Sequence, residues 1–218
     1  GPPAPWGELG PALGLLLVGS LLAQLLINIA PLAIKVIDTS DTAQAGRFLD
    51  AIIVARIPLF FFQAVQASLL PRLSAQAAAG RLDEFRAGLR DILRLVAVVV
   101  VVATLGMFVL GPFVVRVVFG SGFVLGRLDF ALLAFGSELM MAGFTLAYGC
   151  IALAGYGRAA LGWMAGIATV AVALAVLPGD VVRVELAFCA GVVAACTVLA
   201  VGLRGLLARA SERAVAVP

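Results

Sequence analysis

Long apolar runs fill most of this chain, and short polar or Gly/Pro-marked joints separate them. A helix needs about 20 mostly apolar residues to cross a bilayer, and six stretches reach that length. We therefore predict an all-α membrane protein, a bundle of six transmembrane helices without soluble domains. The predicted spans are residues 11–34, 43–70, 95–118, 128–153, 159–177 and 184–207.

A shorter amphipathic stretch, GRLDEFRAGLRDILR, lies between the second and third predicted spans. Apolar residues recur in it at helical spacing, while Arg86, Arg90 and Arg94 share another face. This pattern predicts a short interfacial helix over about residues 80–93. We favour cytoplasmic anchoring by the positive-inside rule over a specific grip on anionic lipid headgroups.

The same rule orients the rest of the chain, because most arginines fall at alternate joints. With six spans they collect on one side of the membrane, which places both termini in the cytoplasm. The residues on this side are Arg72, Arg81, Arg86, Arg90, Arg94, Arg158, Arg204, Arg209 and Arg213.

Composition agrees with a membrane protein and excludes several functions. The chain is 63% hydrophobic, whereas soluble domains are about 45 to 50% apolar. A net charge of +3, spread over several joints, does not indicate nucleic acid binding. The absence of histidine removes Ser-His, Cys-His and HExxH chemistry. Cys150, Cys189 and Cys196 lack metal-site spacing, so we expect no metal, no cofactor and no catalysis.

Polar residues inside the first predicted span form a stripe. Ser20, Gln24 and Asn28 recur every four residues and so share one helical face. The stripe is consistent with two interpretations: it lines a cavity, or it makes interhelical hydrogen bonds worth about 1 kcal/mol each.

The second predicted span carries charge in an apolar surrounding, at Arg47, Asp50 and Arg56. Arg47 and Asp50 are three residues apart, which favours a local ion pair near the outer surface. Arg56 lies about 21 Å into the helix and has no carboxylate one turn away. Pro58 removes a backbone donor just beyond it. Because buried charge is costly in a membrane, we favour a cavity-facing role for Arg56.

Further polar residues extend this candidate cavity. Gln63 lies seven residues from Arg56, nearly on the same face, and Gln66 lies about 80° round the helix. In the fourth span Glu138 is the natural ionic partner for Arg56. Glu138 is also a candidate site for proton or Na⁺ coupling, as is Asp50.

Small residues on the last two spans predict close helix packing. Gly162 and Gly166 form a GxxxG, and Ala187, Gly191 and Ala195 form a ridge of small side chains. These faces indicate a bundle and do not indicate a function.

Three stretches of the chain together resemble a known family. They are AGRFLDAIIVARIPLFFFQAVQASLLPRLS, the basic AAGRLDEFRAGLR, and GPFVVRVVFGSGF at the end of a long apolar span. Their order resembles the second half of polysaccharide-biosynthesis flippases, members of the multidrug/oligosaccharidyl-lipid/polysaccharide exporter superfamily. The resemblance is clearest from Gly46 to Phe123 and extends from about Gly7 to Leu207.

The resemblance implies two six-helix lobes around a central cavity that work by alternating access, a MATE-like architecture. This chain is similar to the C-terminal lobe. A second lobe is then implied as a partner, from an N-terminal half or from another copy of the chain. The positions that match the family pattern are Arg56, Pro58 and the LLP turn at residues 69–71.

The leading hypothesis is a lobe that flips an undecaprenyl-type lipid-linked oligosaccharide across the cytoplasmic membrane of a cell envelope, without making bonds. Arg56 would contact phosphate, and Glu138 would balance charge or couple an ion. Two alternatives stay open, a multidrug cation antiporter of the same superfamily and a non-transporting membrane scaffold. The residues expected to hydrogen-bond sugar or water are Gln24, Asn28, Gln63 and Gln66.

Overall fold

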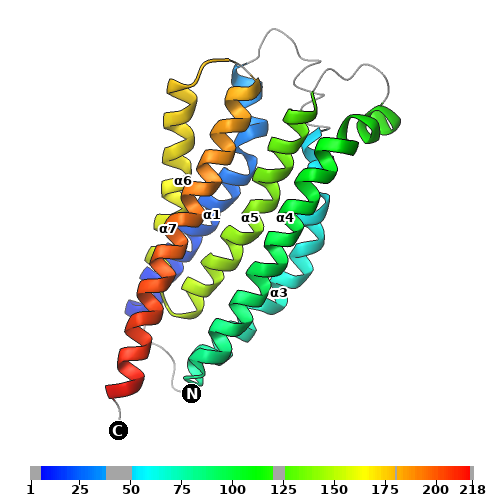
Figure 1. Ribbon diagram of the computed structural model, residues 1–218. Coiled ribbons are helices and arrows are strands. Elements are labelled where there is room, and N and C mark those ends of the chain that lie inside the picture. The colour runs from blue at the N-terminus through cyan, green and yellow to red at the C-terminus, as the bar shows by residue number, and fades with distance from the viewer. Residues whose placement is uncertain (1–5, 38–50, 120–125, 180, 217–218) are drawn as a thin grey trace.

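The computed structural model describes residues 6–37, 51–119, 126–179 and 181–216. Every regular element within these ranges is helical, including residues 51–55. The helices run alongside one another as a bundle (Figure 1). They are α1 (Trp6–Ile37), α3 (Ile57–Ala78), α4 (Leu82–Phe119), α5 (Arg127–Ala152), α6 (Tyr156–Val176) and α7 (Val181–Ala216).

Five of the helices that the structure describes are long and apolar enough to cross a membrane: α1, α4, α5, α6 and α7. The chain is a multi-pass membrane protein. The remaining predicted span, the second one at residues 43–70, begins in a stretch outside the described residues. Its described part contains the first half of α3, and this helix continues through Pro71 and several polar residues to Ala78. The count of six is therefore not established.

The predicted interfacial helix is not a separate element, because α4 runs without interruption from Leu82 to Phe119. Helix-breaking residues are absent between the amphipathic stretch and the apolar core that follows, so the helix continues. Phe85 and Leu89 are buried against the bundle. Arg86 donates a 2.6 Å hydrogen bond to Ser211 near the end of α7. The amphipathic stretch is thus the first part of the same helix as the apolar core that follows it.

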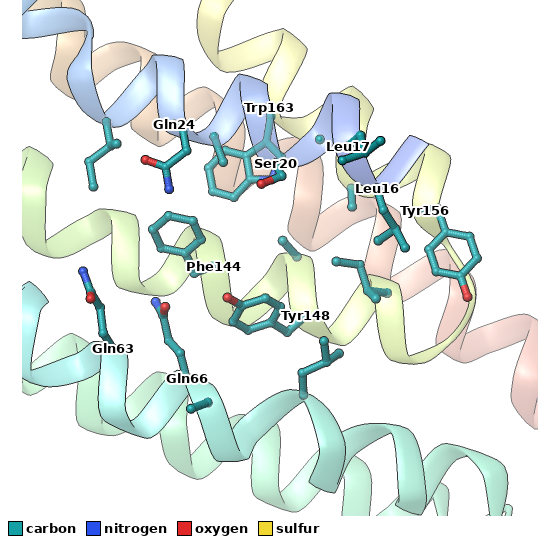
Figure 2. Close-up of a pocket in the computed structure, with 18 of the residues that line it drawn as sticks. Leu16, Leu17, Ser20, Gln24, Gln63, Gln66, Phe144, Tyr148, Tyr156 and Trp163 are labelled. Atoms are coloured by element: carbon teal, nitrogen blue, oxygen red, sulfur yellow. The ribbon is translucent and has the colours of Figure 1, made fainter. Parts of the chain in front are cut away.

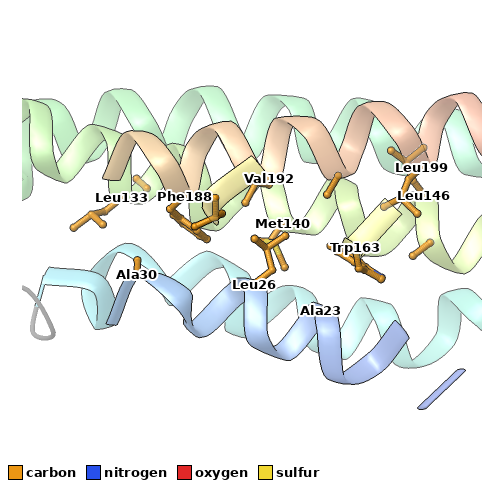
Figure 3. Close-up of a cluster of buried hydrophobic side chains, with 14 of the residues drawn as sticks. Ala23, Leu26, Ala30, Leu133, Met140, Leu146, Trp163, Phe188, Val192 and Leu199 are labelled. Carbon is orange, nitrogen blue, oxygen red and sulfur yellow. The ribbon is translucent and has the colours of Figure 1, made fainter. Parts of the chain in front are cut away.

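α5 is the central helix of the bundle and packs against α3, α4, α6 and α7. Its glycines let neighbouring side chains approach closely. At Gly136, for example, an added Cβ would lie 2.6 Å from Cε1 of Phe188 on α7. Figure 3 shows side chains of α1, α5, α6 and α7 meeting in one buried cluster, with Leu26 beside Met140. This core fixes the positions of the helices that form the pocket described below.

The small-residue faces of α6 and α7 pack against each other, as the sequence predicts. A Cβ at Gly166 would lie 2.9 Å from the carbonyl oxygen of Gly191 and 3.0 Å from Cβ of Ala195. Contacts this short are sterically excluded, so only glycine allows the two backbones to approach to this distance.

Replacing Gly166 by valine is expected to destabilise the protein by about 1 to 3 kcal/mol, because the side chain overpacks the α6–α7 contact. Thermal unfolding in detergent measures the loss. Gly106→Val in α4 is the matched control, since an added Cβ there meets no atom of the described residues within 4 Å. Equal losses in the two variants would show that helix propensity, and not the α6–α7 contact, sets the effect.

Candidate functional site

A pocket of about 950 Å³ opens between α1 and α3, with α5 and α6 behind it. α1 packs on α6 and α7, whereas α3 packs on α5 and α4. This arrangement leaves space between α1 and α3. Figure 2 shows Ser20 and Gln24 of α1 on one side of the pocket, Gln63 and Gln66 of α3 on the other, and Phe144 and Tyr148 of α5 between them.

Five of the candidate site residues line this one pocket: Gln24, Asn28, Arg56, Gln63 and Gln66. Glu138 does not line it. Asp50, the other candidate for ion coupling, lies outside the described residues, as does Arg47. The structure thus brings together residues that are far apart in the sequence, from α1, from α3 and from the turn that precedes α3.

The polar stripe of α1 faces the pocket. Ser20, Gln24 and Asn28 all line it and all are exposed. The hydrogen bond that Asn28 makes is to the carbonyl of Gln24 in its own helix, at 2.9 Å. Among the described residues, these three side chains make no hydrogen bond to another helix. The geometry therefore favours the cavity interpretation of the stripe.

A local break in the helix positions Arg56. Its amide donates to the carbonyl of Ile52 at 3.1 Å, so the chain is still helical up to this point. Arg56 itself has φ −93° and ψ 0°, in a sparsely populated region of backbone space. Pro58 is the second residue of α3, and it cannot donate to the carbonyl four residues earlier. The helix consequently restarts at Ile57.

The guanidinium of Arg56 reaches across the pocket to α1, where Nη2 donates to the backbone carbonyl of Ile27. Its Nε is buried and makes no hydrogen bond. Gln66 Nε2 is also buried without a partner. Both atoms are donors that make no hydrogen bond among the described residues, and both are buried away from the open part of the pocket.

The predicted pairing of Arg56 with Glu138 is wrong. Glu138 is fully buried in α5 and lies behind the pocket wall. Its carboxylate faces the backbone amide of Leu59, but neither oxygen makes a hydrogen bond of ordinary geometry to any residue that the structure describes. The reason is angular: Glu138 lies six residues before Phe144 on α5, about 120° round the helix from the face that lines the pocket.

Two groups of residues in the structure are absent from the sequence-based site. The first comprises Phe144, Tyr148 and Trp163, which line the pocket but look like ordinary apolar residues of a span. The second is Glu185, which is fully buried and faces Asp129 across the α5–α7 contact. Glu185 follows a polar joint in the sequence, so it resembles a residue of the membrane surface. Predicting that Glu185 is buried would have required knowledge of how α5 and α7 pack.

The electrostatics of the pocket are simple. Among the lining residues that the structure describes, Arg56 is the only one with a charge, and the other polar ones carry amides or hydroxyls. Groups of three or more metal-ligating side chains do not occur in the described part of the chain. The pocket can therefore offer one positive charge and several hydrogen-bonding groups.

A bundle of apolar helices around a pocket with one charge and several polar side chains is consistent with a membrane transporter. Comparison with known families is more specific. The family model described as "Lipid II flippase MurJ" matches residues 50–129. That stretch contains Arg56, Gln63, Gln66, all of α4 and the start of α5.

The family match is consistent with a flippase of the multidrug/oligosaccharidyl-lipid/polysaccharide exporter superfamily, and it confirms the resemblance stated from the sequence over this stretch. It covers somewhat more than a third of the chain. Neither a curated protein nor a solved structure matches. The match does not include Gln24, Asn28 or the three aromatic residues of the pocket.

Proposed function

We propose that this chain is one lobe of a flippase that moves a lipid-linked oligosaccharide across the cytoplasmic membrane by alternating access. The observation that carries the proposal is the pocket, where Arg56 and four side-chain amides converge. A cationic group beside several side-chain amides suits a ligand that is anionic and rich in acceptors. The family match supports a lipid flippase in general.

In this proposal the guanidinium of Arg56, which is part of the pocket lining, binds the pyrophosphate of the lipid. The amides of Gln24, Asn28, Gln63 and Gln66 bind sugar hydroxyls or water. The lipid tail stays in the bilayer, and the protein makes and breaks no covalent bond. Glu138, and Asp50 in the undescribed stretch, are the proposed groups for ion coupling.

A second six-helix lobe completes the cavity, either from the same polypeptide or from another copy of the chain. Ser20, Gln24, Asn28 and Gln63 are exposed on the open side of the pocket. Polar side chains at this depth are unfavourable against lipid. Cover by a partner lobe removes them from hydrocarbon and leaves an aqueous cavity between the two lobes.

The proposed orientation places both termini in the cytoplasm. Figure 1 shows the end of α3, the start of α4, the α5–α6 joint and the end of α7 at one end of the bundle. The joints and helix ends at this end carry the arginine-rich segments, including Arg72, Arg158 and Arg209. By the positive-inside rule this end is cytoplasmic.

The test is reconstitution of the full-length protein in vesicles that contain a fluorescent lipid-linked oligosaccharide. A membrane-impermeant quencher measures how fast the lipid changes leaflet, and faster exchange than in protein-free vesicles is expected. Parallel vesicles loaded with a cationic dye test the antiporter alternative. Dye efflux without lipid exchange would replace the proposal by cation export. Neither activity, with binding to a second lobe retained, would indicate a scaffold.

A further inference from the structure

The pocket contains a continuous aromatic surface that the phosphate and amide contacts do not use. It consists of Phe144, Tyr148 and Trp163, called the aromatic wall below. We propose that the aromatic wall stacks against a sugar ring of the substrate and so selects lipids whose pyrophosphate carries a glycan. This inference rests on the proposed function, because it assigns a part of the same pocket to one part of the same ligand.

The geometry of the wall comes from α5 and α6. Phe144 and Tyr148 are one turn apart on α5, with ring centroids 6.5 Å apart and ring planes inclined by 25°. Trp163 of α6 lies behind them, with its ring centroid 5.3 Å from that of Phe144. Only 3% of Trp163 is exposed, so it supports Phe144 and leaves the other two rings to present most of the surface.

A glycine maintains this support. Gly143 precedes Phe144, and a Cβ there would lie 3.0 Å from Cη2 of Trp163. The absence of a side chain at this position lets the indole lie against the α5 backbone. The ring of Phe144 is thus held from behind.

The neighbours of the wall decide between a sugar and a lipid tail. Figure 2 shows Gln24 and Ser20 above Phe144 and Tyr148, and Gln63 and Gln66 below them. A sugar ring has an apolar C–H face for the aromatic rings and a rim of hydroxyl groups for the amides. A prenyl chain in the same place would leave these amides without partners, which is unfavourable for buried polar groups.

The lining of the pocket changes along its length from polar to aliphatic, which fits a sugar at the aromatic wall. The opposite end is lined by aliphatic side chains, among them Leu13, Leu16 and Leu17 of α1. Figure 2 shows Leu16 and Leu17 on the Tyr156 side of the pocket, away from Gln63 and Gln66. The aromatic wall therefore lies between a polar part and an aliphatic part, where a ligand with both characters is matched.

Trp163 itself provides the measurement. The chain contains two tryptophans, Trp6 and Trp163, so Trp6→Phe in the full-length protein leaves Trp163 as the tryptophan reporter of this chain. Tryptophans elsewhere in the full-length polypeptide are replaced in the same way. Two probes are titrated in lipid nanodiscs, a polyprenyl pyrophosphate that carries a disaccharide and the same polyprenyl pyrophosphate without sugar.

The disaccharide lipid is expected to bind about tenfold more tightly than the sugar-free lipid and to change Trp163 emission in a saturable way. Phe144→Leu and Tyr148→Leu should each reduce this advantage, the ratio of the two affinities within one variant, to about twofold. Tyr148→Phe keeps the ring and should keep most of the advantage. Phe61→Leu is the matched control, since Phe61 is 77% exposed on α3 and does not line the pocket.

The outcomes separate this inference from the function on which it rests. If the protein with the unmodified aromatic wall binds the two lipids equally tightly, the sugar-stacking role is overturned and phosphate binding is not affected. Tighter binding of the disaccharide lipid that survives both leucine substitutions also overturns it, because the sugar is then recognised elsewhere. Binding of neither lipid contradicts the proposed function itself. If Phe144→Leu weakens binding of both lipids, Tyr148→Leu is compared with it. Weaker binding of both lipids in both variants contradicts a sugar-specific wall.

Discussion

Arg56→Ala is expected to slow lipid-linked oligosaccharide flipping at least about a hundredfold, the largest functional effect of any substitution in the pocket. Arg56 is the only charged side chain among the described lining residues. Its Nη2 donates to the carbonyl of Ile27, which fixes the guanidinium at the pocket lining. Removal of the guanidinium takes away the charge and the donors together, while the amides are left facing an unneutralised pyrophosphate.

Arg56→Lys is expected to retain an intermediate rate. Lysine keeps the charge but lacks the planar fork that binds two phosphate oxygens and the Ile27 carbonyl at once. Rates are measured in vesicles by the leaflet-exchange assay, with equal amounts of folded protein confirmed by gel filtration. Arg90→Ala is the matched control, because Arg90 is exposed on α4 and lies outside the pocket lining. Unchanged flipping in Arg56→Ala would place the phosphate at another site.

The sequence predicts the local features of this site well. The four-residue spacing of Ser20, Gln24 and Asn28 places them on one face, and that face lines the pocket. Pro58 predicts a weak point beside Arg56, and the helix breaks there. Both features depend on residues within one or two turns of each other, so helical geometry and backbone chemistry determine them.

Features that depend on how helices pack could not be predicted in the same way. Whether Arg56 meets Glu138 depends on the rotation of α5 relative to α3, and no spacing within either helix encodes that angle. Phe144 and Tyr148 are of residue types that also occur on helix faces in contact with lipid, so the sequence does not mark them as pocket residues. Amphipathic periodicity is also the same for a separate interfacial helix and for the end of a longer helix, so the pattern in residues 80–93 does not reveal that the stretch is continuous with the apolar core.

Glu138→Leu is expected to stabilise the protein, by about 1 to 3 kcal/mol. Glu138 is fully buried, and both carboxylate oxygens lack a hydrogen bond or ion pair in the described part of the chain. Around it lie apolar side chains such as Leu59 and Met141, which form one buried cluster with Val96. A leucine of similar volume avoids the desolvation of a carboxyl group and adds apolar contacts to that cluster.

Thermal unfolding in detergent measures this gain, at about 2 to 4 °C per kcal/mol for a chain of this size. Glu212→Leu is the control, because Glu212 is exposed near the end of α7 and its replacement should change little. Each variant and the unmodified protein are melted in sodium and in choline buffer. A loss of stability in Glu138→Leu would contradict the expectation that the carboxyl lacks a partner. If sodium also stabilised the unmodified protein but not the variant, that partner would be a bound cation, as ion coupling at Glu138 requires.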